Sequence, residues 1–244
     1  MTYASEVLGL AQRVAESQSE PVSRAAALFV TSIMAGGVVN AFGSGHSEAI
    51  AMEIAGRAGG LVPSNRLTPR DLVLYGGEPP SVLTPELERD PAVAQRIFDL
   101  APVEPADVFV LVSSSGVNGT VVELATIVKD RGHPLIAITS VQHSTRMTSR
   151  HPSGRKLLDL ADVVLDNGAP YGDAVLDLPG GGSYGAVSTI TSALLAQMVV
   201  TEAVDRLVAL GETPPIYLSA NVTGGDEHNQ ALESRYAGRI RRGS

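Results

Sequence analysis

The chain has 244 residues, of which 44% are hydrophobic and 18% charged, and its formal net charge at pH 7 is −8. This balance allows one substantial core, and the negative charge argues against nonspecific nucleic-acid binding. Cysteine is absent, which excludes disulfides and thiolate metal sites. No apolar run approaches the ~20 residues of a membrane-spanning helix, and no signal pattern opens the sequence. We expect a cytoplasmic protein with neither nucleic-acid nor membrane partners.

Apolar residues at helical spacing mark two helices before the first strand. Val7, Leu10 and Val14 share one helical face, and the segment from Val22 to Ile33 repeats the pattern. We expect a helical hairpin over residues 1–36. It either covers the core or forms part of an interface between subunits.

The first strand, residues 38–42, runs into the turn Gly43-Ser44-Gly45-His46-Ser47, and a helix is expected directly after it. A short strand is expected at residues 60–63. The stretch from residue 64 to 91 reads as irregular, and loops of that length are often functional. Its residues Asn65, Arg66 and Arg70 either reach a ligand or lie on the surface.

A second turn, Ser113-Ser114-Ser115-Gly116-Val117-Asn118, follows the apolar run at residues 108–112 and precedes a helix expected at 120–131. A loop between a strand and a helix can bind phosphate. Its amides and hydroxyls donate hydrogen bonds, and the positive end of the helix dipole attracts the negative charge. The chain has only two lysines, Lys129 and Lys156, so such a site would use amides, hydroxyls or arginines. Two turns of this kind indicate a phosphorylated ligand.

Further elements follow the second turn. Strands are expected at residues 134–139, 163–165 and 174–176, and a long helix at 187–210. The strand, helix and strand from residue 108 to 139 form a right-handed βαβ pattern, which is typical of a parallel sheet. A polar segment from Gly224 opens a last helix.

The G-x-G-x-S pattern at Gly43, Gly45 and Ser47 and the S-x-S-G-x-[TN] pattern from Ser113 to Asn118 resemble those of the SIS (sugar isomerase) domain family. The resemblance implies an α/β fold, a flavodoxin-like three-layer αβα sandwich with a mostly parallel sheet. It also implies sugar phosphate ligands, no cofactor, and homodimers or homotetramers with shared sites. The domains would then be a hairpin at 1–36, the SIS domain at 37–210, and a C-terminal extension and helix at 211–244.

The same resemblance assigns phosphate and substrate binding to hydroxyls, amides and one asparagine. Asn118 stands where the family usually has threonine, and Ser114 and Gly116 would offer backbone amides. A hydroxyl at the start of the long helix, from Ser188 or Thr189, would either bind the ligand or cap that helix. The full set is Ser44, Ser47, Ser113, Ser114, Ser115, Gly116, Asn118 and Ser188.

Catalysis on an open-chain sugar phosphate would begin with removal of the C2 proton, which the C1 carbonyl acidifies, by a carboxylate. Glu53 is the first candidate, because residues 52–57 resemble the region of sedoheptulose-7-phosphate isomerases that carries their catalytic glutamate. Its alternative role is a salt bridge with Arg57 one helical turn away. Glu48 is the reserve base.

Histidines provide further candidates for acid–base work. His46 lies in the first turn, where it could open the sugar ring or only form a hydrogen bond. His228 and Glu227 could complete the site of a neighbouring subunit, or their segment could serve only as a helix cap. The metal-associated histidine of the isomerases has no counterpart in residues 188–200, and the spacing of His143 and His151 fits no usual zinc site. We expect no metal.

The fate of the deprotonated sugar defines the reaction. Loss of the C3 oxygen is elimination, as in the related N-acetylmuramic acid 6-phosphate etherases, and return of the proton to C1 is isomerisation. The first hypothesis is a phosphosugar lyase or dehydratase acting on an N-acetylhexosamine 6-phosphate, within a broader class of amino-sugar or hexose 6-phosphates. An aldose-ketose isomerase and a non-catalytic phosphosugar sensor are the alternatives.

Two rival interpretations come from other glycine-rich segments. Residues 181–185 fit the G-x-S-x-G elbow of serine hydrolases, with Asp205 and His228 downstream. The first turn also resembles a dinucleotide-binding loop, but Glu48 replaces its third glycine. The hydrolase hypothesis leaves both phosphate-type turns without a role.

Overall fold

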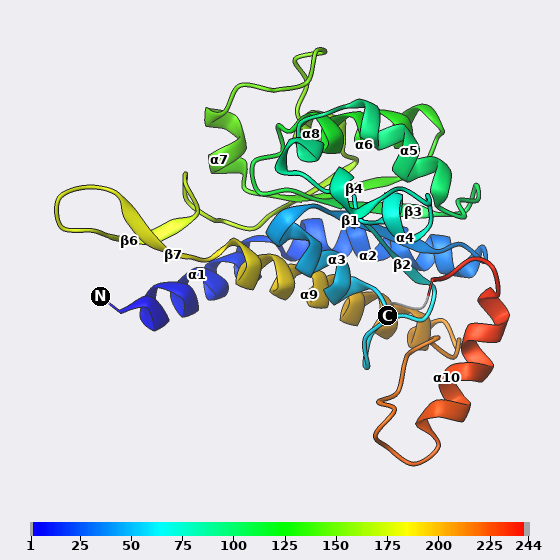
Figure 1. Ribbon diagram of the computed structural model, residues 1–244. Helices are drawn as coiled ribbons and strands as arrows, with labels where there is room; N and C mark the ends of the chain where they lie inside the picture. The colour runs from blue at the N-terminus through cyan, green and yellow to red at the C-terminus, as the bar shows by residue number, and fades with distance from the viewer. Residues whose placement is uncertain (1, 242–244) are drawn as a thin grey trace.

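The sheet at the centre of the molecule is parallel and has five strands in the order β2-β1-β3-β4-β5. The computed structural model describes residues 2–241; Met1 and the last residues of the expected C-terminal extension, 242–244, lie outside the described part. This architecture (Figure 1) confirms the flavodoxin-like α/β fold. The strands are β1 (Val39–Gly43), β2 (Ser64–Leu67), β3 (Val108–Val112), β4 (Leu135–Thr139) and β5 (Val163–Asp166).

Four helices cover one face of the sheet, and α9 contacts each of the other three. The expected N-terminal helices are present; they are joined at Gln18, and both pack along α9. These helices are α1 (Tyr3–Ser17), α2 (Ser19–Met34), α3 (Glu48–Ile54) and α9 (Ser188–Ala209). The N-terminal segment therefore packs into the same core as the sheet, and the division at residue 36 stays a prediction.

The opposite face is covered by a second layer, drawn above the sheet in Figure 1. The layer consists of α4 (Asp71–Leu74), α5 (Ala92–Leu100), α6 (Gly119–Asp130) and α8 (Leu157–Leu160). Two 3₁₀ turns, η2 (Pro80–Val82) and η3 (Pro85–Glu88), precede α5, and α7 (Val141–Arg146) follows β4.

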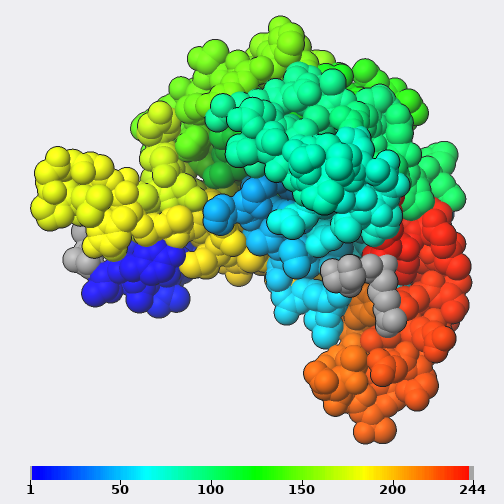
Figure 2. All heavy atoms as spheres, in the orientation of Figure 1, coloured from blue at the N-terminus to red at the C-terminus, as the bar shows by residue number. Residues whose placement is uncertain are grey.

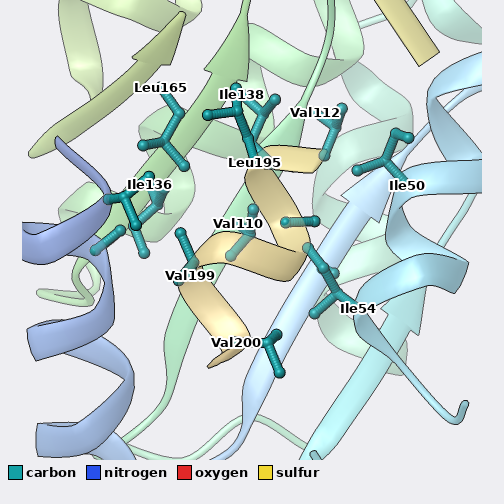
Figure 3. Packing of buried hydrophobic residues seen from close by; sticks show 14 of the residues in the cluster. Ile50, Ile54, Val110, Val112, Ile136, Ile138, Leu165, Leu195, Val199 and Val200 are labelled. Carbon is teal, nitrogen blue, oxygen red and sulfur yellow. The ribbon is translucent and has the colours of Figure 1, made fainter. Parts of the chain in front are cut away.

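The central strands are apolar throughout because both of their faces are buried. Side chains alternate along a strand, so Val110 and Ile136 face α9, whereas Phe109 and Leu135 face α5 and α6. Figure 3 shows Val199 of α9 packed beside Val110 and Ile136. Each such side chain contributes roughly 1.5–3 kcal/mol by burial. This core holds the carboxyl ends of the strands in fixed positions.

A two-stranded antiparallel hairpin of β6 (Ala174–Asp177) and β7 (Ser183–Ala186) stands outside the main sheet. It projects with the start of α1 from one side of the molecule (Figure 2), and Tyr3 Oη donates to Ala186 O at 2.6 Å. The expected strand at 174–176 thus exists, but in this hairpin. Gly181 and Gly182 end the hairpin turn and Ser183 begins the exposed strand β7, so the G-x-S-x-G segment does not lie between a strand and a helix and the hydrolase elbow was wrong.

The strand expected at residues 60–63 was also misplaced. Leu61 forms only an isolated bridge with Ile216, and β2 begins at Ser64, which pairs with Val39 of β1. Pro63 lies between the bridge residue Leu61 and Ser64, the first residue of β2. Because proline has no N–H to donate to a neighbouring strand, the strand begins after it.

The C-terminal segment folds back onto the amino ends of the strands. It comprises α10 (Gly225–Glu233), the turn η4 (Ser234–Tyr236) and a strap at residues 239–241. Arg239 Nη2 pairs with the fully buried Asp107 Oδ1 at 2.6 Å, and Asp107 also accepts from Asn40 Nδ2 at 3.2 Å. Asn65 Nδ2 donates to Arg239 O at 2.7 Å. We call these four residues the strap network.

None of the helices within residues 2–241 is both long enough and apolar enough to cross a membrane. The same residues contain no cluster of three or more histidine, aspartate or glutamate side chains placed to hold a metal ion.

Candidate functional site

The strand order places the two turns side by side. From β1 the chain crosses to β2 through α3 on one face, and from β3 it crosses to β4 through α6 on the other. Gly43 at the end of β1 pairs with Val112 at the end of β3. In open α/β sheets, ligands bind in the crevice at such a switch point.

The first turn is short because it folds back on itself. Gly43 has no side chain, and a Cβ there would lie 2.2 Å from Ser47 O. Gly45 adopts a φ of 55°, which favours glycine. Ser44 precedes the 3₁₀ turn η1 (Gly45–Ser47), which leads into α3 and leaves His46 exposed. The turn thus presents Ser44 and His46 at the carboxyl end of β1.

The second turn is fixed by the neighbouring strand β4 rather than by its own helix. Ser114 O accepts from Ser140 N at 3.1 Å and from Thr139 Oγ1 at 3.2 Å. The amide of Gly116, expected to serve a ligand, donates instead to Ser113 Oγ at 3.1 Å within the turn. Ser114 Oγ is buried and has no hydrogen-bond partner among the described residues. A buried hydroxyl without a partner is uncommon in native proteins, and this one lies in the turn that leads into α6.

Glu88 lies between the two turns. Its Oε2 is 3.4 Å from Asn118 Nδ2 in the second turn, and its Oε1 would lie 2.8 Å from a Cβ on Gly45 in the first. Asn118 Oδ1 also accepts from Arg150 Nη1 at 3.1 Å. The sequence reading missed Glu88 and Arg150, because neither belongs to a motif and both are brought there by loops.

The turn that carries Glu88 is anchored to the start of α6. Thr120 Oγ1 donates to Asp90 O at 2.8 Å and also to Leu87 O. Gly119 lets the backbone directly after η3 approach closely, since a Cβ on residue 119 would lie 2.2 Å from Arg89 O. The segment expected to be irregular is therefore held against the second turn.

A pocket of about 420 Å³ lies over the first turn. Its walls include Ser44, His46, Glu48 and Glu88, together with Arg70. Glu48 is fixed by two arginines, Arg70 Nε at 3.3 Å and Arg66 at 3.8 Å. The pocket therefore offers two carboxylates, a histidine and an arginine beside the phosphate-type turns.

Glu53 lies elsewhere. It forms an ion pair with Arg57 and accepts from Gln197 Nε2 of α9 at 2.7 Å, and it is not among the residues that line the pocket. The alternative role considered for it, the i,i+4 salt bridge, is present. Its catalytic role stays a prediction.

The remaining candidates do not meet the turns within one chain. His228 and Glu227 are exposed on α10, where His228 Nε2 contacts Ile216 O at 3.0 Å. This contact lies beside the segment that leads into the amino end of β2, whereas the turns follow the carboxyl ends of their strands.

Ser188 is paired with Asp173. Its Oγ donates to Asp173 Oδ2 at 2.6 Å, and its amide donates to Oδ1 at 2.8 Å. The aspartate thus caps α9, and the serine itself is not the cap.

The fold and the paired turns agree with the comparison to known families. The SIS domain model matches residues 2–140, and this chain belongs to the SIS domain family. It is 38% identical over 241 residues to the UPF0309 protein lmo0025 of Listeria monocytogenes, covering 98% of each chain. It is 41% identical over 224 residues to the UPF0309 protein BH3325 of Halalkalibacterium halodurans, covering 91% of each chain.

Solved structures share the fold at lower identity. The phosphoheptose isomerase GmhA from Neisseria gonorrhoeae superposes with a TM-score of 0.55 at 20% identity, covering 81% of this chain and 93% of that one. The Vibrio vulnificus NanR protein complexed with ManNAc-6P gives a TM-score of 0.50 at 16% identity, covering 97% of this chain and 67% of that one. These likenesses establish the architecture, and the chain is a SIS-domain protein.

Proposed function

We propose that this protein is an enzyme that binds a hexosamine 6-phosphate at the two turns and removes its C2 proton. The observation that carries the proposal is the place of Glu88, a carboxylate between both turns at the switch point of the sheet. The phosphate would lie against the second turn, where Ser114 Oγ has no partner among the described residues.

Within the pocket the two carboxylates have different roles. Glu48 is held by two arginines and would orient the sugar hydroxyls. Glu88 contacts only the side-chain amide of Asn118 among the hydrogen bonds of the described chain, so it is free to exchange a proton with the sugar. His46, exposed at the mouth, would assist opening of the ring.

The preferred reaction is elimination from an N-acetylhexosamine 6-phosphate. An acetamido group at C2 does not lead to a simple ketose, so a carbanion at C2 would instead expel the C3 oxygen. The likeness to the NanR protein complexed with ManNAc-6P supports an N-acetylhexosamine phosphate as the ligand class. Isomerisation of a hexose 6-phosphate is the alternative outcome.

Proton NMR in deuterated buffer tests this proposal. N-acetylglucosamine 6-phosphate, N-acetylmannosamine 6-phosphate and glucose 6-phosphate would each be incubated with the protein. We expect the C2 proton signal of an N-acetylhexosamine phosphate to disappear as the C3 oxygen leaves as water and a double bond forms between C2 and C3. Exchange with formation of a ketose would select isomerisation. Binding without any exchange would reject catalysis and leave a sensor.

We also propose that His228 and Glu227 act in the site of a neighbouring subunit, because the turns of their own chain lie at the other end of the strands. Mixing two inactive variants, Ser114→Ala with His228→Gln, should then restore up to about a quarter of wild-type turnover if subunits pair at random in a dimer. No recovery, with mixed dimers verified by native mass spectrometry, would show that each chain uses its own α10.

A further inference from the structure

A groove continues from the site along the outer edge of β2. The 420 Å³ pocket shares Gly45, Glu48 and Arg70 with a second hollow of about 530 Å³. That hollow shares Met52 and Arg66 with a third of about 250 Å³. The three form one path that leads away from the phosphate-type turns.

The far end of the groove is rich in positive charge, although the whole chain carries −8. It is lined by Arg57, Arg66 and Arg241, with Asp71 and Tyr75 between them. We call this third hollow the Arg66–Asp71 pocket. A concentration of guanidinium groups in a concave surface favours an acidic ligand, because each can form a bidentate contact with a carboxylate or phosphate.

Two of the arginines already have partners. Arg57 pairs with Glu53, and Arg241 contacts Asp71 Oδ2 at 3.4 Å and Leu100 O while its guanidinium lies 3.8 Å from the centre of the Tyr75 ring. Arg66 has a looser partner. Its carboxylate partner in the described chain, Glu48 Oε1, is 3.8 Å away, which is within ion-pair distance but beyond hydrogen-bond range. Its side chain is 20% exposed.

Asp71 supplies a second observation. Its side chain is 1% exposed; Oδ2 accepts from Thr68 N at 3.2 Å, but Oδ1 is buried without a hydrogen-bond partner among the described residues. Burial raises the pKa of this carboxyl to about 6, against the lowering effects of the Thr68 amide and of Arg241 and Arg66. A buried acceptor without a donor is uncommon in native proteins. A ligand hydroxyl would satisfy it.

We infer that the Arg66–Asp71 pocket is a second ligand subsite, which takes a carboxylate or another acidic group that carries a hydroxyl beside it. The acidic group would bind Arg66, and the hydroxyl would donate to Asp71 Oδ1. This inference rests on the proposed function for the other end of the groove. The acidic group belongs either to the far end of the sugar phosphate or to a separate hydroxy acid.

A pair of open-chain ligands tests the subsite. Sorbitol 6-phosphate and 6-phosphogluconate differ only at C1, which is a hydroxymethyl group in the first and a carboxylate in the second. Calorimetric titration of the full chain should give a tighter dissociation constant for 6-phosphogluconate, by about 10-fold, as a charge-assisted hydrogen bond to arginine provides. Arg66→Gln should remove this preference, so that the two ligands bind with dissociation constants within about twofold of each other. Arg13→Gln, at an exposed position of α1, removes the same charge as a control and should keep the preference.

A third titration distinguishes an acidic group at the far end of the sugar phosphate from one on a separate hydroxy acid. Gluconate added to protein saturated with sorbitol 6-phosphate would bind only if the pocket takes a separate hydroxy acid, and Arg66→Gln would abolish that binding. Either form of Arg66-dependent carboxylate binding supports the subsite. Equal binding of both phosphates, with no gluconate binding, would overturn it and leave the proposed function intact. Failure of both phosphates to bind would overturn the subsite and the proposed phosphate site together.

Discussion

Replacement of Glu88 by glutamine should lower turnover of the hexosamine phosphate by about 10²–10⁴-fold, which is the usual contribution of a general acid or base. The amide keeps the size of the side chain and can still accept from Asn118, whose Nδ2 is 3.4 Å from Glu88 Oε2. Sugar-phosphate affinity should therefore change by less than about threefold. Steady-state kinetics and calorimetric titration would measure the two effects separately.

Glu86 provides the matched control. It lies on the same 3₁₀ turn, is exposed, and does not line the pocket. Glu86→Gln should keep wild-type kinetics. If Glu88→Gln also keeps its turnover while Glu53→Gln loses it, proton transfer belongs to Glu53, as the resemblance to the isomerases implies. If Glu88→Gln loses affinity in proportion to its turnover, Glu88 binds the substrate and does not transfer the proton.

Truncation of Arg239 to alanine should lower the free energy of unfolding by about 3–5 kcal/mol, because it leaves a buried charge without its partner. Asp107 is fully buried, and Arg239 Nη2 lies 2.6 Å from its Oδ1. The amides of Val38 and Glu104 would still donate to this carboxylate, at 2.8 and 3.0 Å, which keeps the loss near the lower end of the range. Urea unfolding at pH 7 measures the change.

Arg235 serves as the comparison, since it is exposed on η4 a few residues earlier. Its replacement by alanine should change stability by less than about 0.5 kcal/mol. Equal effects of the two substitutions would mean that the strap network contributes nothing specific. Arg239→Lys should recover only part of the loss, because an ammonium cannot reproduce the contacts of the guanidinium with Asp107 and Pro102 O.

The sequence predicted the parts of the site that are local. Each turn follows an apolar strand and precedes a helix, so Ser44 and Ser113 could be placed at the carboxyl edge of a parallel sheet from their neighbours alone. Pairing of the adjacent strands then brings the turns together. The geometry around Gly43, which excludes a side chain, agrees with the glycine of the motif.

Glu88 could not be found in this way. It lies 30 residues from Asn118 along the chain, and its position depends on hydrogen bonds from Thr120 to the carbonyls of Leu87 and Asp90, on either side of it. Such contacts have no periodicity or spacing that a sequence reveals. The hydrolase motif failed for the opposite reason. Gly181 and Gly182 have positive φ in a hairpin turn and Ser183 begins β7, so residues 181–185 match an elbow only by composition.

The strap network also limits the order in which native contacts can form while the chain is being synthesised. Its hydrogen bonds join Arg239 to Asp107 across 132 residues and to Asn65 across 174. The ribosome synthesises β1, β2 and β3 long before Arg239. The polar side chains of Asn65 and Asp107 therefore lack their last hydrogen-bond partner until then. Closing such long loops has an entropic cost, and only the contacts of the folded chain offset it. The edge strand β2 therefore reaches its final set of partners only after Arg239 and Arg241 have been synthesised.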